Sequence, residues 1–444
     1  MKKVLYLPIE VKKREYHAKL LLALYALERG YQVVIGPKAS IYSNIKNFSP
    51  GIIIGTGITS DIGARLLRAK AAGHIAVAFD EEGLVGDNQE VQMTAKIKDD
   101  ILRRIDYFFT WGMYHDELVK QIAPELENYS AIGNMRFEIL KQKYRSFFEK
   151  DVQAIAKRYG KYILINTNFG FVNSVISGEY ILQLNESYFG DIDNESHSKE
   201  MIEYEKEVFE SFRALVSSLA KNNITINFIL RPHPSENIET WKKLLRAPNI
   251  IVENRGSVIP WIIASQAVIQ KNCTTATEAV YLDRPVITYC VKHESRFSSI
   301  ISDKIGCLCR TEEEVMKALE NPEKLKEQLE KDKQLLSGYV SNMETSENVG
   351  TAVLDVLDRF DVPAHDKINL MFNGNRNLLK NIKKVIKKQR KTSNDVLYKQ
   401  NKFPELTVNE IKRDIKHLAE TIQQRYSSIA VSNIDENLYN LTIK

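Results

Sequence analysis

Short apolar runs alternate with amphipathic stretches along most of this chain. The first run, KVLYLPI (3–9), is followed by a stretch with helical periodicity at 18–29, which stops at Gly30. Apolar runs that are bounded by turn residues and separated by helices are typical of parallel strands covered on both faces. The same rhythm predicts a helix at 60–72 and further strands at 31–36, 51–57, 74–79, 107–112 and 129–134. Parallel βαβ units are therefore expected here.

A second series of the same kind follows a polar helical stretch at about 137–159. Its strands are expected at 162–168, 224–230, 249–254, 267–272 and 285–290, and its helices at about 198–220 and 311–340. A chain of 444 residues is too long for one ordinary core.

The sequence therefore predicts an α/β protein with two Rossmann-like, doubly wound parallel-sheet domains, at 1–155 and 156–365. A basic helical tail with little core material is expected at 366–444. Because ligands of open α/β sheets bind at the carboxyl ends of the strands, the motifs below are expected to face one another across a cleft between the two domains.

The composition argues against several classes of protein. The chain contains no run of 18 apolar residues, which excludes a transmembrane helix, and its first apolar run is too short for a signal peptide. The irregular spacing of the four cysteines favours buried free thiols in a reducing cytoplasm over a zinc site; they are Cys273, Cys290, Cys307 and Cys309.

The net charge of +5 is concentrated in one short segment. Eight cations and no acid lie between Arg376 and Lys391, so the rest of the chain carries close to −3. This distribution argues against a nucleic-acid-binding surface. In 375–391 the apolar side chains share one helical face and lysines surround it, as in an interfacial helix on an anionic inner-membrane surface. A solvated basic helix, or docking to an acidic partner, is the alternative.

Three adjacent acids follow the apolar run at 74–79. They are Asp80, Glu81 and Glu82, in the stretch AFDEEGLV. Like charges this close cannot all stay ionised cheaply, so at least one pKa is expected to rise toward that of a useful general base. The alternative is a loop of solvated acids.

The stretch LRPHPSEN (230–237) comes directly after a predicted strand. Its two prolines fix φ on either side of His233, which suits an imidazole that is aimed at a ligand. His233 could donate to a phosphate oxygen, and Arg231 could pair with the same anion. The alternative is a surface histidine in a strand-end turn.

A polar turn followed by a helix start is expected in QKNCTTATEAV (270–280). Thr275 and Glu278 fit a capping box, which would satisfy the first helical amides. Free amides at a helix start, together with the hydroxyls of Thr274 and Thr275, are also well suited to phosphate.

The remaining motifs carry weaker signals. Gly55 and Gly57 lack the third glycine of a dinucleotide fingerprint, although a backbone approach to a ligand stays plausible. Asn168 could line the cleft or belong to a simple loop. Asp191 and Asp193 have D-x-D spacing but lie in a polar loop, so we expect no catalytic metal.

The order of DEEG, RPHP and CTT…E over about 1–355 resembles the GT-B glycosyltransferases of bacterial surface-polysaccharide synthesis. The nearest pattern is that of bacterial sialyltransferases, polysialyltransferases and related Kdo transferases. YLPIEVKKREYHAKLLLA, TWG and GNMRFE are also similar to surface carbohydrate biosynthesis proteins.

The resemblance implies roles for the matching residues. An acid of Glu81-Glu82-Gly83 would be the catalytic base, with Glu81 favoured by alignment of the motif and Asp80 an additional acid before it. His233-Pro234 would contact the phosphate of a cytidine nucleotide. Thr274-Thr275 would be the hydroxyl motif, in which relatives commonly carry serines.

The implied activity is metal-independent transfer of an acidic sugar (sialic acid, Kdo or a related nonulosonate) from a CMP-activated donor to a glycan or lipid-linked acceptor. No cofactor is expected beyond this nucleotide-sugar substrate, and the location is expected to be cytoplasmic, peripheral to the inner membrane. Alternatives are a polyol-phosphate transferase using CDP-glycerol or CDP-ribitol, a UDP-GlcNAc 2-epimerase and a non-catalytic scaffold. The candidate residues are Asp80, Glu81, Glu82 and His233 for catalysis; Arg231, His233, Pro234, Ser235, Asn168, Asn272, Thr274, Thr275 and Glu278 for the donor; and Gly55, Gly57, Asn134 and Arg136 for the acceptor side.

Overall fold

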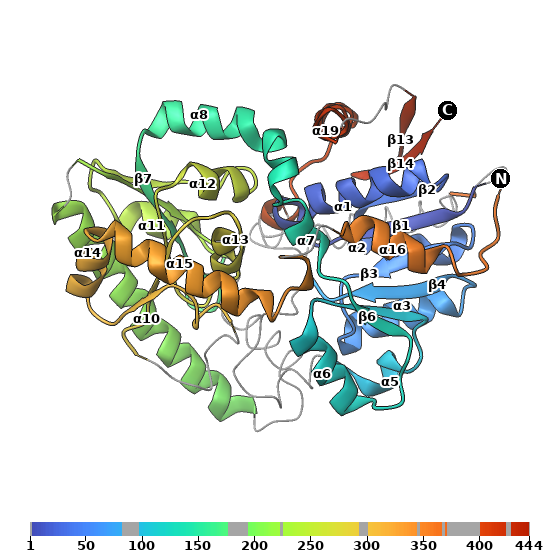
Figure 1. Ribbon diagram of the computed structural model, residues 1–444, viewed down its shortest axis with the longest axis horizontal. Helices are drawn as coiled ribbons and strands as arrows, with labels where there is room; N and C mark the ends of the chain where they lie inside the picture. Colours follow the sequence, from blue (N-terminus) through green and yellow to red (C-terminus); the bar gives the residue numbers. More distant parts are fainter. Residues whose placement is uncertain are drawn as a thin grey trace, which may run out of the picture. The chain divides into compact units, whose positions relative to one another are not determined.

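The computed structural model forms two compact units (Figure 1). The first comprises Met1–Gly83, Lys96–Phe147 and Tyr339–Lys444, and the second comprises Leu84–Ala95 and Phe148–Gly338. The residues that the structure describes are 2–81, 97–175, 194–222, 225–292, 301–343, 347–365, 369–370, 400–422 and 428–443.

The first unit is built on a sheet with the strand order β13-β14-β2-β1-β3-β4-β5-β6. The six strands that come first in the chain pair in parallel and are largely buried, as their apolar sequences predict. They are β1 (Val4–Ile9), β2 (Gln32–Pro37), β3 (Ile52–Gly55), β4 (Ile75–Phe79), β5 (Tyr107–Thr110) and β6 (Tyr129–Ala131).

Helices cover the two faces of this sheet. Helix α1 (Lys12–Glu28) is apolar all round from Leu20 to Leu27. It is covered in turn by α7 (Met135–Glu138), α16 (Val349–Leu357) and α19 (Val408–Thr421). Because right-handed crossovers from β2 to β3 and from β3 to β4 run the opposite way along the sheet, their helices lie on the other face. These are α2 (Lys38–Asn44) and α3 (Ser60–Lys70). The helices α5 (Asp99–Leu102) and α6 (Met113–Ile122) follow them in the chain.

The end of the chain differs from the expected basic helical tail. Helix α19 buries Ile411 and Leu418 beside α1, and a hairpin of β13 (Ile429–Asp435) and β14 (Leu438–Ile443) adds to the sheet through antiparallel pairing of β14 with β2 (Figure 1). The expectation of little core material was therefore wrong for 400–443. Because β2 would otherwise be an edge strand, the hairpin also covers its exposed backbone groups. The basic segment 375–391 lies outside the described residues, so its membrane association stays a prediction.

The second unit is built on a parallel sheet with the strand order β12-β11-β10-β7-β8-β9. Its core includes Phe212 of α10, Trp241 of α11 and Val315 of α14, all on one face of the sheet. The strands are β7 (Tyr162–Asn166), β8 (Asn227–Arg231), β9 (Ile250–Val252), β10 (Val268–Gln270), β11 (Val286–Tyr289) and β12 (Cys307–Cys309). The helices are α8 (Glu149–Tyr159), α10 (Asn194–Asn222), α11 (Ile238–Leu244), α12 (Ile259–Ala264), α13 (Thr275–Tyr281), α14 (Glu312–Leu319) and α15 (Pro322–Ser337).

Two details of this unit follow from local sequence. The helical stretch expected at 311–340 is two helices, because Pro322 starts α15 and the Asn321 side chain accepts from the Lys324 amide at 3.1 Å. All four cysteines are free and buried, as their spacing suggested. Within the described ranges, we find no helix long and apolar enough to cross a bilayer.

Candidate functional site

The carboxyl ends of three neighbouring strands in the second unit carry polar loops. Register pairs Asn166 at the end of β7 with Arg231 of β8 and with Gln270 of β10. The loops that follow these strands, at 167–173, 232–237 and 271–274, therefore emerge side by side at one edge of the sheet. The stretches RPHPSE and CTT, which are separated by about 40 positions in sequence, thus belong to one local site in this unit.

The His233 ring is fixed through its Nδ1 atom. Nδ1 lies 2.7 Å from Ser235 Oγ and accepts from the Ser235 backbone N–H at 3.3 Å. Since Nδ1 is the acceptor, the neutral ring carries its proton on Nε2, which makes Nε2–H a hydrogen-bond donor. Pro234 opens the turn, which closes through a bond from the Glu236 amide to the His233 carbonyl at 2.8 Å.

Glu236 is the centre of this loop, although the sequence did not single it out. Its carboxylate is buried and accepts from the His233 amide at 2.9 Å and from Trp241 Nε1 at 2.8 Å. Thr167 Oγ1 and Asn173 Nδ2 donate to it at 2.7 and 3.3 Å. Burial raises the pKa of Glu236 in spite of these bonds. Glu236 is therefore a positioning residue that joins the loops after β7 and β8.

Arg231 has protein partners that the sequence did not reveal. Its guanidinium is buried, stacks 4.7 Å from the Trp261 ring, and donates to the carbonyls of Arg255 and Gly256 at 3.0 and 3.1 Å. Burial lowers the pKa of Arg231 to about 10, so the side chain stays charged at neutral pH. Arg231 thus supports the loop at 255–256, and its pairing with a phosphate stays a prediction.

The turn after β10 is held by a buried ion pair. Asn272 has φ +51°, a left-handed conformation that asparagine tolerates, and its amide donates to Asp303 Oδ1 at 2.8 Å. Asp303 Oδ2 lies 3.3 Å from Lys271 Nζ, and both side chains are at most 5% exposed. Burial alone would lower the pKa of Lys271, but Asp303 raises it. From the loop after β7, Asn168 Nδ2 donates to the Asn272 carbonyl at 3.0 Å. This bond brings Asn168 and Asn272 together. The Lys271–Asp303 ion pair that holds the turn was not evident from the sequence.

The start of α13 corrects the expected capping box. Thr274 occupies the N-cap position without a side-chain capping bond, and Thr275 is already helical, so the Thr275–Glu278 box does not form. Thr275 Oγ1 instead accepts from Asn166 Nδ2 at 2.9 Å. Glu278 is buried within the helix. Thr274 is half-buried. Of the two threonines in this motif, it is the one whose hydroxyl can contact a ligand at the edge of the site.

The acidic stretch of the first unit also lies at a strand end. Three side chains hold the backbone carbonyls after β4: Trp111 Nε1 and Asn134 Nδ2 (3.4 Å) donate to that of Asp80, and Arg136 Nη1 donates to that of Glu81 at 2.9 Å. The Asn134 side chain also accepts from the Arg136 amide at 2.8 Å. Asn134 and Arg136 are thus brought to the acidic stretch, where they hold its backbone.

Glu81 forms a buried ion pair. Its Oε1 lies 2.6 Å from Lys19 Nζ of α1, and the two side chains are 7% and 3% exposed. Burial would raise the pKa of Glu81, but Lys19, followed by Arg136 and Arg14, lowers it overall. The expectation that crowding would raise the pKa is therefore wrong for Glu81, because a lysine from another element compensates the charge. Asp80 is half-buried, and Glu82 lies outside the described residues.

Gly55 at the end of the neighbouring strand β3 and Gly57 just after that strand serve different purposes. A Cβ at Gly55 would come within 2.8 Å of Leu66 Cδ1, so Gly55 allows α3 to pack on the sheet. A Cβ at Gly57 would lie 3.9 Å from Asp80 Oδ1, which places Gly57 beside the acidic stretch. The Glu81 amide bonds to the Thr56 carbonyl at 3.2 Å. Of the two glycines, Gly57 is thus the one that belongs to this edge.

No family model matches the sequence, and no curated protein matches it significantly. Solved structures match its fold. The wall teichoic acid polymerase TagF is 11% identical, with a TM-score of 0.51 over 80% of this chain and 89% of that one. UDP-GlcNAc 2-epimerase from Neisseria meningitidis, bound to UDP-GlcNAc, is 13% identical, with a TM-score of 0.50 over 81% of this chain and 100% of that one. UDP-GlcNAc 2-epimerase from Methanocaldococcus jannaschii, in complex with UDP-GlcNAc and UDP, is 14% identical, with a TM-score of 0.50 and the same coverage.

The chain has a GT-B fold. The α/β class predicted from the alternating strands and helices is thereby confirmed. At sequence identities of 11 to 14%, these similarities show the fold and not the activity.

The described part of this GT-B fold offers no cluster of three or more His, Cys, Asp or Glu side chains that could hold a metal ion. Asp191 and Asp193, which have D-x-D spacing, lie outside the described residues.

A glycine in the second unit of the GT-B fold tests the loop geometry. A Cβ at Gly170 would overlap Ser235 Oγ, the atom that fixes His233 Nδ1. We expect Gly170→Ala to displace Ser235 and, if the loop binds the nucleotide that the sequence predicts, to weaken that binding by about tenfold, the equivalent of one lost hydrogen bond to a charged group. Titration calorimetry measures the affinity. Gly338→Ala is the matched control, because its Cβ would meet only the Leu335 carbonyl at 3.5 Å. Equal affinity in both variants would contradict this loop geometry.

Proposed function

We propose that this chain is a glycosyltransferase that moves an acidic sugar from a CMP-activated donor to a surface-glycan acceptor. The observation that carries the proposal is the fixed Nε2–H donor of His233, at a strand end shared with the Asn272–Thr274 turn. A rigid neutral donor beside a helix start and a hydroxyl is suited to an anionic leaving group. The GT-B fold supports a nucleotide-sugar enzyme without deciding the donor.

In this proposal the second unit binds the donor phosphate. His233 Nε2–H donates to a phosphate oxygen, and the hydroxyl of Thr274 adds a second donor. As the bond between the sugar and CMP breaks, negative charge grows on that phosphate, and donors that are already in place stabilise it without reorganising. Glu236 and the Lys271–Asp303 pair keep the two loops in position.

The first unit supplies the catalytic base. We assign this role to Asp80, because Asp80 is half-buried at the strand end and can be reached by an acceptor, whereas Glu81 is buried. Asp80 takes the proton of the acceptor hydroxyl, whose oxygen forms the new bond to the sugar. Glu81 acts as a positioning residue that ties the stretch to α1. A hydroxyl that attacks the sugar directly implies inversion of configuration.

One observation favours a second candidate. The GT-B structures that match include TagF, and one TagF structure contains CDPG. The corresponding candidate is a polyol-phosphate transferase, in which His233 would contact the phosphate that is transferred.

Nucleotide preference separates these candidates. We expect CMP to raise the melting temperature of the full chain more than CDP or UDP does, and CMP to be released from a CMP-sugar when an acceptor is present. A stronger shift with CDP, together with turnover of CDP-glycerol, would replace the proposal by the second candidate. A shift with UDP alone and interconversion of UDP-GlcNAc would point to an epimerase, the activity named for two of the matching folds.

A further inference from the structure

Two stretches of the first unit, TWG (110–112) and GNMRFE (133–138), lie at the carboxyl ends of β5 and β6. Each supplies one side chain that donates to the backbone carbonyl of Asp80, namely Trp111 Nε1 and Asn134 Nδ2. Both of these side chains are buried, at no more than 2% exposure. The position of the Asp80 backbone therefore depends on whatever fixes these two loops.

One short segment contacts both loops. It is the return segment (339–342), with which the chain re-enters the first unit after the second. The Ser341 amide donates to the Trp111 carbonyl at 2.8 Å. A Cβ at Gly112 would come within 2.6 Å of the Tyr339 carbonyl oxygen, so only glycine allows the two backbones to approach this closely. The return segment is thus fixed to the loop that carries Trp111.

Asn342 fixes the same segment to the other loop. Its side chain is 1% exposed and pairs with the backbone of Asn134 in both directions. Oδ1 accepts from the Asn134 amide at 3.2 Å, and Nδ2 donates to the Asn134 carbonyl at 3.4 Å and to Glu138 Oε2 at 3.5 Å. A Cβ at Gly133 would overlap Asn342 Oδ1, so this loop is shaped around the amide. Two bonds from one amide group fix both the position and the orientation of the loop.

We propose that Asn342 is a positioning residue for the catalytic base. It fixes the loop of Asn134, whose side chain in turn holds the carbonyl of Asp80, while Ser341 fixes Trp111 in parallel. The inference rests on the proposed function in taking Asp80 as the base. A displacement of about 1 Å from the productive geometry can lower a rate by about 100-fold. Loss of the Asn342 amide would therefore lower the rate and leave the affinity for the donor unchanged, since the second unit binds the donor in that proposal.

The indole N–H signals of the full chain test this link without a substrate. The chain has three tryptophans, and the signal of Trp111 reports its bond to the Asp80 carbonyl. In nitrogen-15 spectra, assigned with Trp111→Phe, we expect Asn342→Ala to shift the Trp111 signal and to leave the two signals of the second unit, from Trp241 and Trp261, in place. Gly133→Ala, which displaces the same amide from the other side, should shift the same signal.

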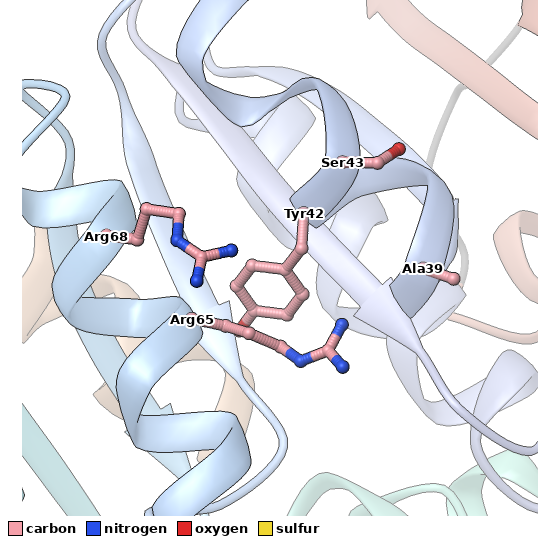
Figure 2. Close-up of a pocket in the computed structure, with 5 residues that line it drawn as sticks. All are labelled: Ala39, Tyr42, Ser43, Arg65 and Arg68. Atoms are coloured by element: carbon pink, nitrogen blue, oxygen red, sulfur yellow. The ribbon is translucent and has the colours of Figure 1, made fainter. Parts of the chain in front are cut away.

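Asn44→Ala is the matched control. Asn44 is another buried asparagine of the first unit, and its side chain donates to the Ser40 carbonyl at 2.8 Å and to Ser43 Oγ at 3.1 Å. Ser43 lines a small cavity between α2 and α3 (Figure 2), which contains no residue of the acidic stretch. We expect Asn44→Ala to lower the melting temperature as Asn342→Ala does, but to leave the Trp111 signal and turnover unchanged.

Turnover per folded molecule gives the second readout, measured with the donor that the wild type uses. We expect Asn342→Ala to lower kcat by about 10- to 100-fold and to leave the KM for the donor unchanged. An unmoved Trp111 signal, an equal shift of that signal in Asn44→Ala, or a normal kcat in Asn342→Ala overturns the assignment. Absence of CMP-sugar turnover in the wild type would instead contradict the proposed function, and the Trp111 signal would still decide whether Asn342 positions the acidic stretch.

Discussion

Replacing His233 by alanine is expected to lower turnover by about 10²- to 10⁴-fold while leaving the fold intact, the range typical of a group that assists the leaving group. The side chain lies in a loop whose backbone is held by Glu236 through the His233 amide, a bond that alanine keeps. The loss should therefore appear in kcat and not in the melting temperature. His417→Ala, on α19 in the other unit, is the matched control and should behave as the wild type.

Amide substitutions separate the two nitrogens of the ring. Glutamine places a donor near the position of Nε2, whereas asparagine reaches only the position of Nδ1. Because Nδ1 already accepts from Ser235, we expect His233→Gln to recover part of the rate and His233→Asn to resemble alanine. A near-normal rate in His233→Ala would contradict the assignment of His233 to the phosphate.

Much of the fold was predictable because buried parallel strands are continuous apolar runs. IIIG in β3 and YILIN in β7 coincide with predicted strands to within two or three residues at each end. The terminal hairpin was missed because polar residues interrupt the apolar runs of both strands, and β13 is partly exposed. Asn437, with φ +60° between the two strands, is the turn signal that could have found it.

The site was predictable only where it depends on local sequence. The prolines around His233 fix the loop, and topology places CTT beside it. Partners that come from distant parts of the chain were not predictable: Glu236 is bonded by Thr167 from 69 positions away, and Asn272 by Asp303 from 31. The partners of Arg231 were missed for the same reason, since its guanidinium donates to the carbonyls of 255 and 256, more than 20 positions away. Sequence shows which groups are present, whereas their pairing depends on tertiary packing.

The roles of the acids also depend on tertiary packing. Their substitution gives the second large expected effect. Asp80→Asn should lower turnover by about 10²- to 10⁴-fold, because an amide cannot take the acceptor proton, and should leave the free energy of unfolding nearly unchanged. Glu81→Gln should instead lower the free energy of unfolding and leave the turnover of the folded molecules nearly unchanged. Removing one partner of a buried ion pair typically costs about 3–5 kcal/mol. We expect the lower end of this range, because the buried Glu15 also interacts with Lys19 and compensates part of its charge. Activity per folded molecule and urea unfolding separate the two effects.

The pH dependence of stability identifies the ion pair. The pKa of Glu81 is lowered in the folded state, so the pair stabilises the protein above the ordinary glutamate value of 4.5. This stabilisation is lost as the pH falls through the lowered folded-state pKa. The difference in unfolding free energy between the wild type and Glu81→Gln should therefore narrow below pH 4.5. The double variant Lys19→Met with Glu81→Leu should be close to the wild type in stability, since apolar replacement of a whole buried pair is often neutral.

These variants also decide which acid is the base. Glu81 would be the base if Glu81→Gln lost turnover with normal stability while Asp80→Asn stayed active. That result would show that the assignment to Asp80 is wrong. Glu82→Gln is the third arm, and loss of turnover in that variant alone would move the role to Glu82. In this proposal the adjacent acids have different roles. Glu81, which is neutralised by Lys19, anchors the strand end, and Asp80 accepts the proton.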